Sequence, residues 1–179
     1  QKRFIPEKFT VPGFKIHHKY LSGLKSGGDY FDVFEFDDRT HLGVFLSDST
    51  GYGLSAALLS VMLRMAFRFG KGSPESPART LTRIFDEVKT MMREGEELSI
   101  FYGLINKRTL EMRYASAGDL RLYLGGESML KAAPGLRRQD RFKGEDRDLV
   151  LTPGTRMALL TDGFAEALGG DAAVTRAFK

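Results

Sequence analysis

The chain has 179 residues, enough for one domain with its own buried core. Hydrophobic residues make up 42% and charged residues 28%, as in ordinary globular proteins. The absence of cysteine excludes disulfides, zinc–thiolate sites and a thiol nucleophile, and it fits a reducing cytoplasm. No apolar run reaches the roughly 18 residues that a membrane span needs, so we expect no span here.

The net charge of +4 is spread along the chain. The densest basic patch, residues 137–148, has acidic residues throughout, whereas phosphate binding needs an unbroken basic face. We therefore expect a solvated loop there and no nucleic-acid partner. The opening residues, QKRFIPEKF, contain neither an initiating Met nor the apolar stretch of a signal peptide. The expectation is a single domain, residues 1–179, from the C-terminal part of a longer protein.

Strand patterns come first in the chain. Residues 13–21, 29–36 and 40–47 each have the apolar and aromatic content of a strand. The second and third are joined by residues 37–40, Asp-Asp-Arg-Thr, which are typical of a tight hairpin turn.

Two helices are predicted next. In residues 54–70 apolar side chains recur at helical spacing, and Gly70 stands where a helix would end. Ser76 and Pro77 then offer an N-cap and a first-turn proline for a second helix that ends at Gly95.

The remainder is predicted to be mainly strand, followed by a short helix that starts at Asp162. The expected strands are 98–105, 110–118, 120–124, 148–151 and 156–161. Strands, two helices and then antiparallel strands favour an α+β fold over the regular alternation of a parallel sheet.

The hairpin brings two acids together. A turn centred on Asp38 and Arg39 pairs residues whose numbers sum to 77, which places Asp29 opposite Asp48. Directly opposed side chains have Cβ atoms about 4.5–5.5 Å apart, where like charges repel. The pair therefore needs a cation between its members, or a proton on one of them.

A cation is favoured by the surroundings. Carboxylates and carbonyls suit magnesium and manganese, and glycines flank both acids. A third acid, Asp162, ends another buried strand beside a glycine. One strand-end Asp is usually a turn or cap residue, but three together predict a two-metal site that activates water. Asp32 either points to this site through water or faces solvent.

At these residues the chain resembles the SpoIIE-like branch of the PPM-type metal-dependent serine/threonine phosphatases. The motifs that carry the resemblance are GGDYFDVF at 27–34, SDSTGYGLSAALLSVMLR at 47–64, MRYASAGD at 112–119 and LLTDGFAEA at 159–167. The resemblance implies two packed antiparallel β-sheets flanked by helices, an αββα sandwich.

The resemblance also implies the roles of residues. Asp29 and Asp48 would bind two Mn²⁺ or Mg²⁺ ions, helped by the backbone carbonyl of Ser49, and Asp162 would bind one of them. A metal-bridging water would attack phosphoserine or phosphothreonine on a STAS-type anti-anti-sigma protein. An upstream sensor or receiver domain in a bacterial signalling protein is expected, and a homodimer is compatible with it.

Three features depart from the family pattern. Ser49-Thr50 replaces the commoner Val-Ser pair, which a carbonyl ligand tolerates. Asp119 stands where the family often has His, which puts any role of that His in doubt. The family also has a further metal-binding Asp that opens a last strand, and residues 169–179 resemble that strand with Asp171 as the acid. Because the interval between Asp162 and Asp171 is much shorter than in the family, we expect that a stretch is missing between Ala167 and Asp171.

Two other functions are compatible with parts of the sequence. A degenerate phosphatase-like domain would bind a partner protein without turnover, as the uncertain fourth acid allows. The GGD triplet also resembles the signature of nucleotide cyclases, but Tyr30 and Phe31 follow it in place of Glu-Phe, and the elements do not alternate. The cyclase is therefore disfavoured.

Overall fold

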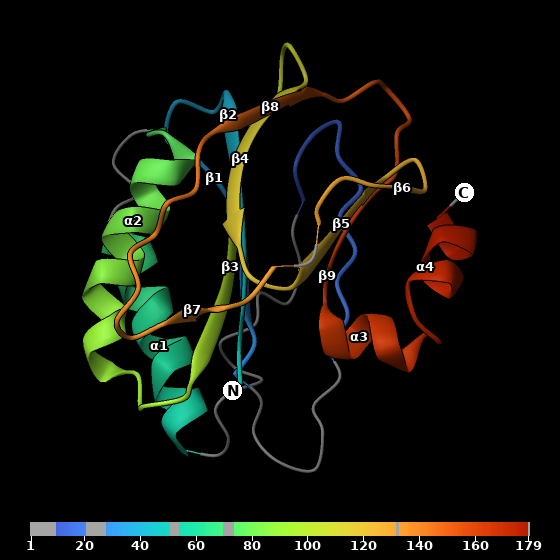
Figure 1. The fold of residues 1–179 in the computed structure, drawn as a ribbon. Coiled ribbons are helices and arrows are strands. Elements are labelled where there is room, and N and C mark those ends of the chain that lie inside the picture. Colours follow the sequence, from blue (N-terminus) through green and yellow to red (C-terminus); the bar gives the residue numbers. More distant parts are fainter. Residues whose placement is uncertain (1–9, 21–27, 51–53, 70–73, 132, 179) are drawn as a thin grey trace.

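The structure is a computed structural model, and it describes residues 10–20, 28–50, 54–69, 74–131 and 133–178 (Figure 1). Two antiparallel sheets face each other. The larger sheet has the order β1-β2-β3-β4-β8, with β7 also paired to β3. Its strands are β1 (Tyr30–Glu35), β2 (His41–Ser49), β3 (Glu97–Asn106), β4 (Glu111–Ala117), β7 (Leu136–Arg137) and β8 (Arg147–Val150).

The smaller sheet has the order β6-β5-β9, and helices cover the outer faces of both sheets (Figure 1). Its strands are β5 (Leu120–Leu124), β6 (Glu127–Ser128) and β9 (Met157–Thr161). The helices are α1 (Leu54–Phe69), α2 (Pro77–Val88), the 3₁₀ turn η2 (Lys89–Met91), α3 (Asp162–Ala167) and α4 (Asp171–Phe178). The predicted α+β sandwich of two sheets with flanking helices is confirmed.

Three apolar clusters fill the layers. The first joins α1 and α2 to the larger sheet, the second lies between the sheets, and the third joins the smaller sheet to α3 and α4. Along β1, Tyr30 and Phe34 belong to the first cluster and Val33 to the second. This alternation is the two-residue period of a strand with both faces covered.

Helix α2 begins as the sequence predicts but ends early. The Ser76 side chain accepts a hydrogen bond from the amide of Arg79, and Pro77 opens the helix. Regular helix stops at Val88, and Gly95 adopts φ +83° only after the 3₁₀ turn. None of the helices in the parts of the chain that are described is long and apolar enough to cross a membrane.

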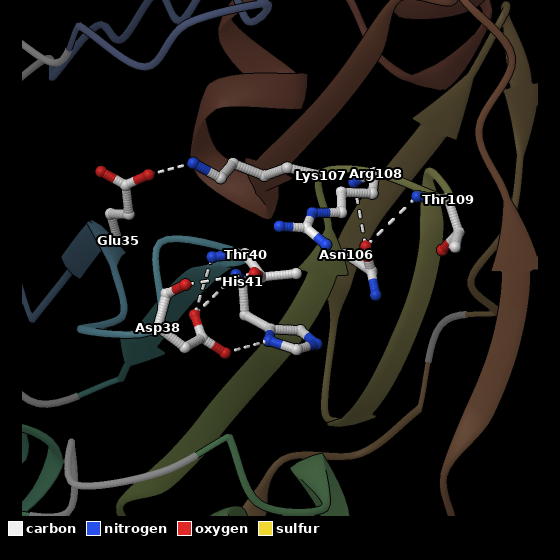
Figure 2. Close-up of polar contacts among 8 residues, drawn as sticks. All are labelled: Glu35, Asp38, Thr40, His41, Asn106, Lys107, Arg108 and Thr109. Carbon is white, nitrogen blue, oxygen red and sulfur yellow. Dashed lines mark hydrogen bonds and ion pairs between the residues drawn. The ribbon is translucent and has the colours of Figure 1, made fainter.

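The hairpin of β1 and β2 has the predicted register. Tyr30 lies opposite Ser47 and Val33 opposite Val44, so paired numbers sum to 77. At the turn, Asp38 accepts hydrogen bonds from the amides of Thr40 (2.8 Å) and His41 (3.0 Å), and its other oxygen lies 2.5 Å from the His41 ring (Figure 2).

The neighbouring turn, between β3 and β4, is built in the same way. The Asn106 side chain accepts from the amides of Arg108 and Thr109, at 2.9 and 3.2 Å (Figure 2). Lys107 forms an ion pair with Glu35, and its amide donates to the carbonyl of Thr40 at 2.8 Å. These contacts tie the two turns together, so the register of β1, β2 and β3 is fixed at this end of the sheet.

Two predictions of secondary structure are wrong. Residues 13–20 form no strand, although Val11 and Phe14 make an isolated bridge; Leu21 lies outside the described residues. Phe14 and Ile16 pack against the cluster between the sheets without a paired neighbour strand. Their apolar character therefore reflects burial alone.

The second error concerns the C-terminal segment, which was expected to be a strand. It is α4, because Asp171–Phe178 is rich in alanine, a strong helix former, and its Val174 is fully buried against the smaller sheet. Only three residues separate it from α3, and Gly169 and Gly170 both have positive φ there. The predicted missing stretch before Asp171 stays a prediction.

We expect the Asp38→Ala substitution to lower the thermal midpoint Tm, because it removes the acceptor of the turn. Hydrogen bonds from the His41 side chain and then from Thr40 lower the pKa of Asp38 from 3.8 to about 2. An acid with a lowered pKa stabilises the fold above its unfolded pKa, and that stability is lost as pH falls toward 2. The difference in Tm between the wild type and the variant should therefore shrink from pH 6 to pH 2. Asp37→Ala is the control, and an equal effect of both would contradict the account.

Candidate metal centre

Three acids from both sheets meet at one end of the sandwich. Asp29 immediately precedes β1, Asp48 is the penultimate residue of β2, and Asp162 follows β9 as the first residue of α3. Asp48 shares its strand face with Leu42 and Leu46, which pack in the cluster between the sheets. Its carboxyl group is therefore directed at the smaller sheet, from which Asp162 comes.

The three carboxyl groups are in direct contact. Asp48 is hydrogen-bonded to both Asp29 and Asp162, and Asp29 also bonds with the side chain of Thr161. Burial, and next the charge of Asp29, raise the pKa of Asp48 to about 9. Burial is also the main cause that raises the pKa of Asp29. The cluster thus has the charge repulsion that the hairpin register predicts. A proton shared between the carboxyl groups reduces that repulsion.

A divalent cation is the other means of relief. Metal ligands must be deprotonated, so an ion that enters this cluster displaces the proton on Asp48. Within the described ranges, no three His, Cys, Asp or Glu side chains are spaced as ligands of one ion. The acids bond to each other instead, through the oxygens that an ion would take. Their number and chemistry suit a hard cation such as Mg²⁺ or Mn²⁺.

The main chain beside the acids is tightly packed. A Cβ atom on Gly28 would lie 2.6 Å from the carbonyl oxygen of Ser49, so only glycine fits there. The Ser60 hydroxyl on α1 donates to the Gly28 carbonyl at 3.2 Å. The buried Ser49 hydroxyl has no hydrogen-bond partner among the described residues. Ser49, whose carbonyl is the predicted backbone ligand, therefore lies beside Asp29. The flanking residues Gly27, Gly51 and Gly53 lie outside the described residues.

A pocket of about 400 Å³ opens beside the cluster, and its wall is strongly acidic. The lining residues are Asp48, Thr50, Glu97, Ser99, Asp119, Ala133, Pro134, Gly135 and Asp162. Sequence reasoning missed Glu97, Ser99 and the segment 133–135. Glu97 and Ser99 reach the site because β3 pairs with β2, which places Ser99 opposite Asp48, and the segment 133–135 lies there because β7 pairs with β3. Tyr20 was also missed: burial and the charges of Asp29 and Asp48 raise its pKa, so its phenol lies near them.

Asp119 and Asp32 take positions that the sequence left open. Asp119 lines the pocket with Asp48 and Asp162, and its amide donates to the Ser99 hydroxyl at 3.0 Å. Asp32 does not face solvent, so that expectation is wrong. It does not line the pocket either, and its link to the site through water stays a prediction. It is buried on the helix side of β1, where the Tyr30 hydroxyl donates to it at 3.2 Å.

Asp171, the expected fourth metal ligand, is held elsewhere. It is the first residue of α4, and its carboxylate accepts hydrogen bonds from Arg121 (2.9 Å) and Tyr123 (3.0 Å). The described contacts of Asp29 and Asp48 do not include it. Its role as a ligand stays a prediction, and these contacts do not support it.

Residues 38–178 match the family model described as stage II sporulation protein E, SpoIIE. The chain belongs to the SpoIIE family. It is 22% identical over 172 residues to the phosphoserine phosphatase RsbP of Bacillus subtilis (strain 168). That alignment covers 91% of this chain but only 42% of the length of RsbP.

Solved structures show the same fold in other SpoIIE-type proteins. RsbX, crystallised in complex with magnesium, superposes with a TM-score of 0.65 at 17% identity, over 90% of this chain and 85% of RsbX. The PP2C phosphatase domain of SpoIIE from Bacillus subtilis superposes with a TM-score of 0.62, also at 17% identity, over 86% of this chain and 48% of that chain. The sandwich is thus a PP2C-type phosphatase fold.

The Asp48→Asn substitution should stabilise the metal-free protein. Asn removes the repulsion from Asp29 and Asp162 and still donates a hydrogen bond. Because the pKa of Asp48 rises from 3.8 to about 9 on folding, the stability that its proton provides is lost as pH rises between these values. The gain in Tm should therefore be larger at pH 8 than at pH 5, at roughly 2–4 °C for each kcal/mol.

Thermal unfolding in a metal chelator at both pH values measures this effect. Asp148→Asn is the control, since Asp148 is an exposed acid on β8 that pairs with Arg113. A lower Tm for Asp48→Asn at pH 8 would show that the acids do not repel one another.

Proposed function

We propose that this chain is a metal-dependent protein serine/threonine phosphatase. The observation that carries the proposal is the contact of Asp29, Asp48 and Asp162, from both sheets, at one end of a PP2C-type sandwich. Half-buried acids that repel one another lower the stability of the fold, and a cation site is the function that accounts for such an arrangement.

The ligands that we propose are Asp29, Asp48, the carbonyl of Ser49 and Asp162. Two Mn²⁺ or Mg²⁺ ions, when bound, would supply an activated water and neutralise charge on the phosphoryl group. The chain's own contribution is to hold the carboxylates at the ends of paired strands. Gly28 lets the main chain just before β1 lie against Ser49, and Thr161 orients Asp29 through a hydrogen bond.

The substrate that we propose is a phosphoserine or phosphothreonine on a STAS-type anti-anti-sigma protein in the cytoplasm. The likeness to RsbP, named a phosphoserine phosphatase, supports the phosphoryl group. A pocket of about 400 Å³ with an acidic wall suits it as well, because bound cations would make the wall attractive to a phosphate. An upstream sensor or receiver domain and a homodimer remain part of this proposal.

A second candidate is a phosphatase-like domain that binds its partner without turnover. The contact that favours it is the ion pair of Asp171 with Arg121, which engages the acid expected to complete the metal site. The two candidates differ in whether a bound phosphoprotein loses its phosphate.

The deciding assay is phosphate release from a phosphoserine STAS-type protein, with and without Mn²⁺. We expect release that requires Mn²⁺ and that falls by about 10²–10³-fold in Asp48→Asn, the range for loss of one group that supports electrostatic stabilisation of the transition state. The matched control is Asp32→Asn, a buried acid of the same hairpin that faces the helices. Binding of the phosphoprotein by the wild type without any release would support the second candidate.

A further inference from the structure

One arginine connects the acidic pocket to the C-terminal helix. Arg121 lies on β5, and its guanidinium forms an ion pair through Nη1 with Asp119 and, through Nε at 2.9 Å, with Asp171 of α4. Its side chain is only 16% exposed. Figure 1 shows α4 beside the smaller sheet, on the side away from the larger one. The planar guanidinium has enough donors to serve both carboxylates at once.

The main chain at Asp119 is fixed independently of this arginine. Gly118 has φ +89°, and a Cβ there would lie 2.6 Å from the Cα of Ser99. The Ser99 hydroxyl accepts a hydrogen bond from the Asp119 amide at 3.0 Å. The remaining freedom of Asp119 is therefore that of its carboxylate, and Arg121 restricts it.

The restriction matters because the Asp119 side chain is 40% exposed. Asp119 shares the pocket with Asp48 and Asp162, and a carboxylate without a partner there would turn out into water. The charge-assisted hydrogen bond from Arg121 opposes that movement. Asp171, which also accepts from the buried hydroxyl of Tyr123 at 3.0 Å, holds the arginine from the other side.

We propose that Arg121 is a positioning residue of the metal centre. It holds the carboxylate of Asp119 on the pocket wall, and Asp171 holds Arg121 in turn, so that α4 supports the site from a distance. This inference rests on the proposed metal-dependent function. It gives Asp171 a role in the site through Arg121, without requiring it as a ligand.

The test is calorimetric titration of the chain with Mn²⁺, which needs no turnover. Arg121→Lys keeps the charge but cannot hold both carboxylates, so we expect the Kd for Mn²⁺ to rise about tenfold, the low end for groups that orient a metal site. In the Asp119→Asn background, the same change should alter the Kd by less than about twofold, because Arg121 acts through Asp119.

Two further variants complete the design. Asp171→Asn leaves Arg121 charged and removes its support, so we expect a smaller rise in Kd, about threefold. It also tests the proposal if Arg121→Lys folds poorly. Arg113→Lys is the matched control, since Arg113 pairs with the exposed Asp148 on the larger sheet, and it should bind Mn²⁺ like the wild type.

An unchanged Kd in both Arg121→Lys and Asp171→Asn would overturn the proposal. An equal rise for Arg121→Lys in the wild-type and Asp119→Asn backgrounds would overturn it as well, because it would show a general loss of structure. Failure of the proposed phosphatase is visible separately, as wild-type protein that binds Mn²⁺ and the phosphoprotein but releases no phosphate.

Discussion

The repulsion between Asp29 and Asp48 is the constraint on which the site depends. Strand register places the two carboxyl groups face to face, and their partial burial removes much of the water that would screen their charges. The fold tolerates this repulsion because the larger sheet is packed on both faces and the turns at the other end fix the strand register. Asp162 adds a third charge from the opposite sheet, so the cluster joins the two halves of the sandwich.

Support for this cluster extends outward in two directions. On the larger sheet, Ser60 of α1 bonds to the Gly28 carbonyl, which connects the helical layer to the residue before Asp29. On the smaller sheet, Arg121 connects the pocket wall to α4. Among the described residues, polar side chains thus connect α1 and α4 to the acidic end of the sandwich.

The hairpin and its acids could be predicted because the information is local. Residues 37–40 specify a tight turn, and the strand register follows by counting outward from it. The two-residue period of a strand then determines the face on which each side chain lies. Other features depend on contacts that no local pattern shows. Asp171 meets Arg121 only because α4 packs on β5, fifty residues away in the chain. Asp32 looked like a site residue because it shares the strand, but strand parity directs it to the helices.

The most direct measurement is the number of protons released when Mn²⁺ binds. Titration calorimetry at pH 7, in buffers with different ionisation enthalpies, gives this number. The pKa of about 9 for Asp48 requires close to one proton to leave the cluster for the wild type, and close to none for Asp48→Asn if it binds at all. Binding of Mn²⁺ without proton release, or with the same release in Asp48→Asn, would show that the ion does not enter the cluster of Asp29, Asp48 and Asp162.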